Sequence, residues 1–323
     1  MHLGPRWPQY DRTPNHVGVN PYETLLGASN VSNLSVLWSF AFPCSVYGSP
    51  AVVDGSVFTS SYCGDAYALD ATTGAVRWSV HLPSYATFSP AVYENDVYFP
   101  SKDGTLNAYN VANGSLVWHQ NIGPSVDAAD PVVADGIVYQ GNIAGEMFAF
   151  RASDGTLLWS ASTGGTIDST ATVANGMAYQ AANTNQLMAF NAKTGGSVWT
   201  FQNSGLIADA PAVSGNTLYA GTENATVVAL NAATGDLIWT GQIAAGPSCP
   251  GNGAPNGVST PAVWGNVVYA SSSNCNVTAL DGATGQTLWT AIVGGQPGGK
   301  GPVIANGVLY VSAADNYLYG SMP

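Results

Sequence analysis

Four aspartates, three aromatic residues and a lysine lie beside seven short segments that recur along the chain, six of them opening at a proline. The aspartates belong to the third, fourth and fifth segments, the aromatic residues to the first two, and the lysine to the seventh: Asp127, Asp130, Asp168, Asp209, Tyr47, Tyr85, Phe88 and Lys300. Carboxylates could hold a hard cation or sugar hydroxyls, and aromatic rings could stack on a ligand ring. The sequence therefore predicts a ligand pocket with one acidic and one aromatic wall. The alternative interpretation is that these carboxylates only cap turns.

No catalytic constellation accompanies these residues. The chain has no Gly-x-Ser-x-Gly motif, no histidine pair at metal-ligand spacing and no Cys-x-x-Cys-His motif. His81 and His119 each follow a tryptophan on an expected outer strand, where a surface position is expected. We assign no catalytic residue, and the question of enzymatic activity stays open at this stage.

Seven tryptophans set the spacing of the elements that must position the candidate site. They are separated by 40, 40, 41, 40, 40 and 50 residues: Trp38, Trp78, Trp118, Trp159, Trp199, Trp239 and Trp289. A period of this size indicates a repeat architecture. Six of them end one motif, Ala-x-Asp/Asn-x-x-Thr-Gly-x-x-x-Trp, in which only the alanine, the glycine and the tryptophan are present in all copies.

Each motif position has a physical explanation. The glycine suits a tight hairpin that needs a positive φ. Asp or Asn four residues earlier is expected to bond nearby backbone N–H groups, and Arg151 in the third copy predicts a less well tied turn. The tryptophan is expected to pack between neighbouring sheets with its indole N–H bonded to one acceptor. Trp264 lies outside the series, in a turn, and is expected at the surface.

One repeat, residues 49–80, contains four short apolar runs separated by turn residues such as Asp54-Gly55, which predicts an antiparallel meander. The first-strand signal recurs seven times, from Ser49-Pro50 to Gly301-Pro302. Trp38 lies in a last strand, Leu34 to Phe40, without three strands before it, and residues 301–321 supply three strands without a last one. The sequence therefore predicts an all-β, seven-bladed β-propeller of four-stranded antiparallel blades, with the ring closed by the N-terminal strand. Residues 1–32 form an N-terminal arm and residues 33–323 a single propeller domain.

The repeated motif resembles the tryptophan-docking motif of PQQ-type quinoprotein propellers and their non-enzymatic relatives, over roughly residues 34–321. The leader Trp7-Pro-Gln-Tyr10…Asn15 is similar to the arm that packs across the ring in such proteins. The resemblance implies either a binding propeller or a dehydrogenase that uses pyrroloquinoline quinone and Ca²⁺. The enzymes typically have eight blades, about twice this length and often a disulfide between adjacent cysteines, whereas no two cysteines are adjacent here.

The four cysteines occupy two equivalent places. Cys44 precedes the first strand of blade 1 and Cys63 lies in its second hairpin, and Cys249 and Cys275 are placed likewise in blade 6. Both loops of a meander emerge on one face, which favours the pairs Cys44–Cys63 and Cys249–Cys275 among three connectivities. A zinc site is the rival interpretation, but it would need all four thiolates at one ion although blades 1 and 6 are not adjacent. Disulfides imply an extracellular, cell-surface or periplasmic location.

Composition excludes other classes of protein. The net charge is −12, with 7 basic and 19 acidic residues, so no nucleic-acid partner is expected. The chain contains no run of 18 or more apolar residues, so no transmembrane segment is expected. The start Met1-His-Leu-Gly-Pro lacks the charged and apolar regions of a signal peptide.

Two functions follow from these observations. The first is an extracellular binding or scaffold propeller that recognises a protein, glycan or small-molecule ligand at the channel mouth. The alternative is a PQQ-type quinoprotein dehydrogenase that oxidises alcohols or sugars with a bound divalent cation. Low charge and the lack of a catalytic cluster favour the first. Residues 246–257 lengthen the interval before Trp289 and form a second place to look for function or a disulfide-tied decoration.

Overall fold

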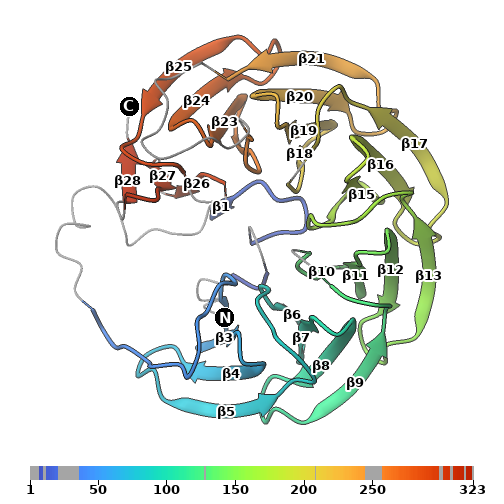
Figure 1. Cartoon of the computed structure of the whole chain (residues 1–323), viewed down its shortest axis with the longest axis vertical. Helices are drawn as coiled ribbons and strands as arrows, with labels where there is room; N and C mark the ends of the chain where they lie inside the picture. Colours follow the sequence, from blue (N-terminus) through green and yellow to red (C-terminus); the bar gives the residue numbers. More distant parts are fainter. Residues whose placement is uncertain are drawn as a thin grey trace.

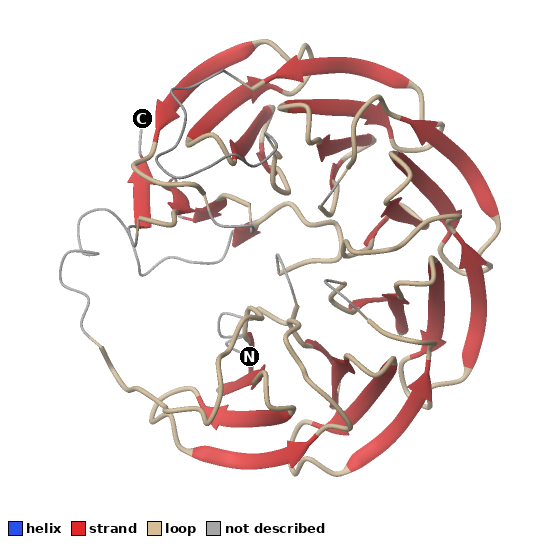
Figure 2. Cartoon of the chain, viewed as in Figure 1, coloured by secondary structure: helices blue, strands red, loops and turns tan. Residues whose placement is uncertain are grey.

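The computed structural model describes residues 7–9, 12–20, 36–126, 129–207, 209–243, 257–297, 301–305, 308–315 and 318–321. Within these ranges every regular element is a β-strand, and the strands form seven four-stranded sheets. The sheets are arranged as blades around a central axis (Figure 1), joined by the loops drawn in Figure 2. The predicted all-β class and the number of blades agree with this arrangement. The described residues contain no helix that could cross a membrane.

Blades 1 to 6 each contain four consecutive antiparallel strands, ordered from the centre outward. Blades 1 and 2 consist of β2 (Ala51–Val53), β3 (Ser56–Ser60), β4 (Asp65–Asp70), β5 (Val76–His81), β6 (Ala91–Tyr93), β7 (Asp96–Ser101), β8 (Thr105–Asn110) and β9 (Leu116–Asn121). Blades 3 and 4 consist of β10 (Val132–Ala134), β11 (Ile137–Gly141), β12 (Glu146–Arg151), β13 (Leu157–Ser162), β14 (Thr172–Ala174), β15 (Met177–Ala182), β16 (Gln186–Asn191) and β17 (Ser197–Gln202). Blades 5 and 6 consist of β18 (Ala212–Ser214), β19 (Thr217–Gly221), β20 (Thr226–Asn231), β21 (Leu237–Gln242), β22 (Ala262–Trp264), β23 (Val267–Ser272), β24 (Asn276–Asp281) and β25 (Thr287–Ile292).

The tryptophans hold neighbouring blades together as the motif predicts. Trp159 is buried, and its indole N–H donates to the carbonyl oxygen of Ala192 in the next blade at 2.9 Å. Tyr139 donates its hydroxyl to the same oxygen at 3.0 Å, so two buried rings of one blade share a single acceptor on the next. The same pairs of donors recur in the two following blade junctions, and burial raises the pKa of the Tyr179 hydroxyl to about 12.

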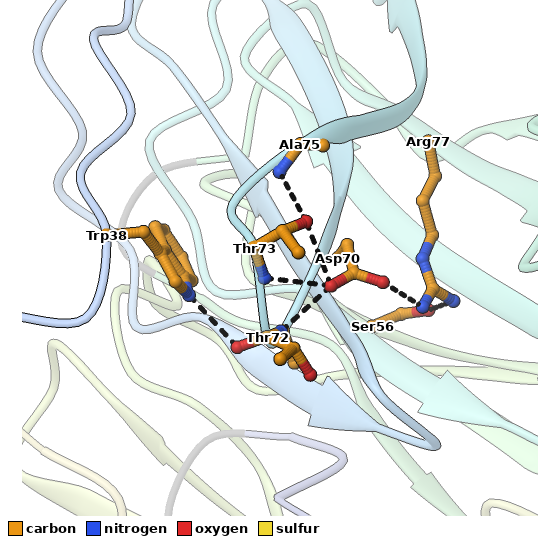
Figure 3. Close-up of polar contacts among 8 residues, drawn as sticks. Trp38, Ser56, Asp70, Thr72, Thr73, Ala75 and Arg77 are labelled. Carbon is orange, nitrogen blue, oxygen red and sulfur yellow. Dashed lines mark hydrogen bonds and ion pairs between the residues drawn. The ribbon is translucent and has the colours of Figure 1, made fainter.

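The motif glycine has a second role that the sequence did not reveal. Gly195 adopts a φ of 72°, as expected for the hairpin, and a Cβ atom there would lie 2.6 Å from the Trp159 ring. The tryptophan of each preceding blade thus lies flat on the glycine turn of the next. Figure 3 shows the first of these contacts, in which the Trp38 indole reaches the turn of Asp70. The carboxylate of Asp70 accepts the N–H groups of residues 72 and 73, which confirms the expected cap.

The turn at Arg151 lacks the side-chain acceptor that the motif places there, because a guanidinium only donates. Asp154 accepts the N–H of Thr156 at 2.9 Å and pairs with the Arg151 guanidinium at 2.9 Å. Gly155 still donates its N–H to the Arg151 carbonyl oxygen, as the other motif glycines do. The bond from Thr156 has a counterpart in the other copies, such as the one from Ala75 to Thr73, so it does not replace the missing cap. Asp70 accepts two backbone N–H groups of its turn and the Arg151 guanidinium accepts none, in line with the less well tied turn that the sequence predicts.

Blade 7 is assembled from both ends of the chain, but not in the way that the sequence suggested. It consists of β1 (Val19–Asn20), β26 (Val303–Ala305), β27 (Val308–Ser312) and β28 (Leu318–Ser321). The N-terminal strand β1 pairs with β26 in parallel at the inner edge, so this blade is not entirely antiparallel. Residues 36–40 form no strand, while Leu34 lies outside the described residues, and closure by a strand from Leu34 to Phe40 is not confirmed. Trp289 of the preceding blade stays 40% exposed.

The N-terminal arm crosses the centre of the ring, contacts the inner strand of blades 1 to 6 in order and itself supplies β1 of blade 7. The middle residue of each of these six strands, and of β26 in blade 7, donates its backbone N–H to the arm, at N···O distances from 2.7 to 3.2 Å. The donors are Val52, Val92, Val133, Val173, Val213, Val263 and Ile304, and the acceptor atoms belong to Trp7, Pro8, Gln9, Pro14, Asn15, Val17 and Gly18. The arm thereby pairs the inner edges of the sheets, which would otherwise leave backbone groups without partners along the channel.

Candidate binding site

The loops that enter the inner strands form ties between blades. The N–H of Ser49 donates to the Ser89 hydroxyl at 3.0 Å, and the N–H of Ser89 donates to the Asp130 carboxylate at 2.7 Å. The N–H of Asp130 in turn donates to the Thr170 hydroxyl at 3.1 Å. Each residue thus accepts a bond from the equivalent residue of the preceding blade. Asp130 is 4% exposed, and its carboxylate serves this chain of bonds.

Asp209 has a similar structural role in blade 5. Its carboxylate accepts the N–H of Ala210 at 2.9 Å and that of Thr260, in blade 6, at 3.1 Å. The tie to Thr260 runs in the reverse direction, because the N–H of the later blade donates to a carboxylate of the earlier one. Both aspartates therefore behave as the alternative interpretation expected, as loop residues that bond backbone N–H groups.

Of the remaining predicted site residues, the structure describes Phe88, Asp168, Tyr47 and Tyr85. Phe88 is 4% exposed and belongs to the hydrophobic core, so its ring is not available at the surface. Asp168 is half-buried, and Asp127 and Lys300 lie outside the described residues. His81 and His119 are exposed on the outer strands β5 and β9, as expected, and His81 pairs with Asp65 at 2.8 Å.

The aromatic prediction leads to a surface cluster that contains two predicted tyrosines and one that the sequence reasoning missed. Tyr62 and Tyr85 stack with ring centroids 4.8 Å apart and planes inclined by 11°. Tyr47 approaches Tyr62 edge-on, with centroids 6.2 Å apart. Tyr47 is 67% exposed, Tyr62 47% and Tyr85 49%. We call Tyr47, Tyr62 and Tyr85 the tyrosine cluster.

A disulfide and two backbone bonds position the tyrosine cluster. Cys44 and Cys63 are bridged, with Cα atoms 5.7 Å apart, which confirms the first predicted pair. The N–H of Tyr62 donates to the Ser45 carbonyl oxygen at 2.8 Å, so the two loops that carry Tyr47 and Tyr62 run together. The carbonyl oxygen of Tyr85 accepts the N–H of Lys102 from blade 2 at 2.9 Å. The cluster thus spans blades 1 and 2 on one face of the ring.

Tyr62 could have been found from the sequence. It directly precedes Cys63, and the expected disulfide already placed that hairpin beside the loop of Tyr47. The predicted site comprised only loops before first strands, whereas Tyr62 lies in the hairpin between β3 and β4. The long loop of residues 246–256 and Cys249 lie outside the described residues, so the Cys249–Cys275 pair stays a prediction.

The chain's residues do not fit the quinone and Ca²⁺ that the resemblance raised. The carboxylates of Asp130 and Asp209 are occupied by backbone N–H groups of neighbouring loops. Among the described residues no group of three His, Cys, Asp or Glu side chains could hold a metal ion. The arm also takes up the inner-strand N–H groups at the channel, where a cofactor at its mouth would otherwise find donors. We derive no chemical step through either group.

The fold and this site define a tryptophan-docked propeller with an exposed aromatic surface. The chain belongs to the PQQ-like repeat family, since the family model described as outer membrane protein assembly factor BamB matches residues 26–128 and 102–321. No curated protein sequence matches the chain.

Solved structures show the same fold at low sequence identity. BamB from Moraxella catarrhalis is 22% identical with a TM-score of 0.75, and the match covers 88% of each chain. The quinohemoprotein alcohol dehydrogenase ADHIIG from Pseudomonas putida HK5 is 16% identical with a TM-score of 0.77, over 98% of this chain and 70% of that one. A europium-containing methanol dehydrogenase is 13% identical with a TM-score of 0.77, over 98% and 85%. At these sequence identities, the similarities show a shared fold alone.

Proposed function

We propose that the chain is a binding propeller without chemistry of its own, which holds a protein partner through the tyrosine cluster. One observation carries this proposal: the Tyr62 ring contacts those of Tyr47 and Tyr85, all three are about half or more exposed, and a disulfide ties the loops of Tyr47 and Tyr62. Tyrosine is enriched at protein interfaces, because its ring offers a large contact area at low entropic cost and its hydroxyl bonds at the rim. The description of the matching family, an assembly factor, is consistent with a scaffold role.

The partner is expected to bind the loops that carry the tyrosine cluster, and not to enter the central channel. The arm already bonds the inner strands of blades 1 to 6 and β26 of blade 7, so a ligand in the channel would have to displace it. The tyrosine cluster lies on loops and has no such competitor among the described residues. A glycan could also stack on exposed rings, and the experiment below separates that outcome from a protein partner.

The dehydrogenase alternative has its own test. Pyrroloquinoline quinone with Ca²⁺ is expected to leave the melting temperature unchanged and to support no dye reduction with alcohols or sugars, since the aspartates nearest the channel are engaged in loop ties. A rise in melting temperature together with dye reduction would establish the enzyme and remove the present proposal.

We also infer that the segment predicted at Leu34–Phe40 closes the ring beside the outer edge of blade 7, with residues 36–40 docking on blade 1 without forming a strand. Trp38 docks on the turn of blade 1 in the same manner as Trp78 docks on blade 2. Phe40 lies 5.5 Å from the Tyr67 ring, on blade 1. The segment thus docks like the outer strand of a preceding blade. Trp38→Ala should lower the unfolding free energy about as much as Trp78→Ala does, and a much smaller loss for Trp38→Ala would count against this closure.

The disulfides point to an oxidising compartment, either the periplasm or the exterior of the cell. The Cys44–Cys63 bridge supports this location, and no free cysteine occurs among the described residues. Peptide mapping under non-reducing conditions should recover a Cys44–Cys63 and a Cys249–Cys275 peptide. A Cys44–Cys275 peptide would refute the pairing.

The binding proposal is tested by comparing capture from the native host by three forms of the purified protein. The first is the wild type, the second carries Tyr47→Ser, Tyr62→Ser and Tyr85→Ser, and the third carries Trp264→Ser. Trp264 is a matched control because it is an aromatic residue of similar exposure, 54%, outside the cluster. The same protein partner should be enriched by the wild type and the Trp264 variant and lost by the triple variant. Enrichment that survives in the triple variant would contradict the proposal, and loss of enrichment after glycosidase treatment would indicate a glycan instead.

A further inference from the structure

A pocket lies between blades 2 and 3, away from the tyrosine cluster. It has a volume of about 450 Å³ and is lined by the β6–β7 hairpin of blade 2 and the turn after β12 of blade 3. Strands alternate in direction within a blade, so these hairpins emerge on the face opposite to the loops that carry the tyrosine cluster. The pocket is therefore physically separate from the proposed partner surface.

Two of the lining residues depart from the repeat. The first residue of the second strand is Asp96 in blade 2 and is uncharged in the other six: Ser56, Ile137, Met177, Thr217, Val267 and Val308. Arg151 stands where the other five motif copies have Asp or Asn. The scaffold does not require either charge, because the same hairpins form around the other residues. Both departures nevertheless line one pocket, from adjacent blades.

Within the described part of the chain, the positive charge that lines the pocket is paired, whereas the two negative charges are not. Arg151 is already paired, through its Nη1, with the Asp154 carboxylate at 2.9 Å. Glu94 and Asp96 make no side-chain hydrogen bond or ion pair with any other described residue. Burial, and secondly the neighbouring charge of Glu94, raise the pKa of the Asp96 carboxyl. The pocket thus presents two carboxylates that a cation would stabilise.

The walls of the pocket favour an organic cation over a metal ion. The half-buried Tyr93 lines it with its ring, whereas Tyr98 is fully buried behind the wall. The Tyr98 hydroxyl and the Trp118 indole fix the carbonyl oxygen of Ala152 at 3.1 and 2.8 Å. Aromatic rings attract alkylammonium and guanidinium groups, whereas a divalent cation prefers several converging oxygen ligands. No cluster of three metal-ligating side chains occurs among the described residues.

We propose that this pocket binds an alkylammonium or guanidinium group, held by Glu94 and Asp96 against the Tyr93 ring. The group could belong to a free amine or to a lysine or arginine side chain of a peptide, since the chemistry recognised is the same. The site is distinct from the tyrosine cluster and does not depend on the binding function proposed above.

The test is a titration of the isotopically labelled full chain with methylguanidinium and n-propylammonium, followed through the amide signals of Asn95 and Gly136. Saturable shifts are expected in the millimolar range, with a Kd that rises about tenfold or more in Asp96→Asn or Glu94→Gln. Asp54→Asn removes the equivalent carboxylate of blade 1 and should leave the Kd unchanged. Arg151→Asn should leave binding equal or tighter, because it removes a positive charge from the pocket.

Several outcomes would overturn the proposal. These are no saturable shift in the wild type, an unchanged Kd in both carboxylate variants, or loss of binding in Arg151→Asn, which would indicate an anionic ligand group. Displacement of methylguanidinium by Ca²⁺ alone, with the same shifts, would indicate a metal site. A short arginine-containing peptide separates the two sources of the cation: binding tenfold tighter than methylguanidinium supports a polypeptide ligand, and equal binding supports a free amine.

Discussion

The carboxylate of Asp130 accepts a hydrogen bond from the backbone N–H of Ser89, in the preceding blade, at 2.7 Å. This contact separates the scaffold from the binding surface, because an aspartate that seemed a ligand candidate instead joins two blades. Asp130→Ala should lower the unfolding free energy by about 1–3 kcal/mol, since the buried N–H of Ser89 loses its acceptor. Asp130→Ser should cost less, because a hydroxyl can accept the same bond, as Ser89 itself does for Ser49. Urea unfolding measures both, and an unchanged stability of Asp130→Ala would contradict this role.

The contact between Trp159 and Gly195 makes a second prediction. Gly195 and Gly176 both have a positive φ, 72° and 75°, but only Gly195 lies under a tryptophan ring. Gly176→Ala should cost about 1–2 kcal/mol for the backbone conformation alone. Gly195→Ala should cost a further 1–3 kcal/mol or so, because its Cβ would meet the Trp159 ring. Equal losses in thermal or urea unfolding would show that the ring does not need the glycine.

The repeat scaffold could be predicted from the sequence because its determinants are local. The spacing from Gly195 to Trp199 fixes a hairpin and its outer strand within one blade, and the same pattern recurs in six copies. The path of the arm could not be foreseen in detail, because the partners of Trp7 and Gly18 lie up to some 290 residues away. The burial of Phe88 depends on the neighbouring blade and is not visible in its own loop.

Only part of the candidate site could be predicted, because its contacts join residues from separate loops. Tyr47 and Tyr85 were identified by position in the repeat, whereas their contact runs through Tyr62, which lies in another hairpin. The acidic wall stays a prediction: Asp130 and Asp209 bond backbone N–H groups at blade junctions, and the sequence cannot distinguish such a bond from a ligand contact.

The N-terminal arm is expected to stabilise the whole ring. Removal of residues 1–20 takes away one acceptor from each of the seven strands that bond to it, at about 0.5–1.5 kcal/mol for each bond. The melting temperature should therefore fall substantially while the strand content by circular dichroism is kept below the transition. Gln9→Ala, which removes only the acceptor of Val133, should cost about 1 kcal/mol. A truncated chain with the wild-type melting temperature would argue against this role of the arm.

Acid should destabilise the protein through its turn carboxylates. Two backbone and side-chain bonds from Thr156, and then Arg151, lower the pKa of Asp154 from 3.8 to about 2, and the Thr284 hydroxyl is the largest cause of the lowered pKa of Asp281. Both carboxyls lose protons more readily in the folded state, so their contribution is present above pH 3.8 and is lost as the pH falls through the folded value. Melting temperature should drop between about pH 4 and pH 2, less steeply in Asp154→Asn. A flat profile over that range would contradict the assignment.

The most direct test of the binding function is site-specific photo-crosslinking in the native host. A benzophenone amino acid in place of Tyr62 would lie within the tyrosine cluster, and the same group in place of Trp264 would be similarly exposed elsewhere. One discrete crosslinked protein is expected from position 62 and none from position 264. No product from position 62, or the same products from both positions, would contradict a partner bound at the tyrosine cluster.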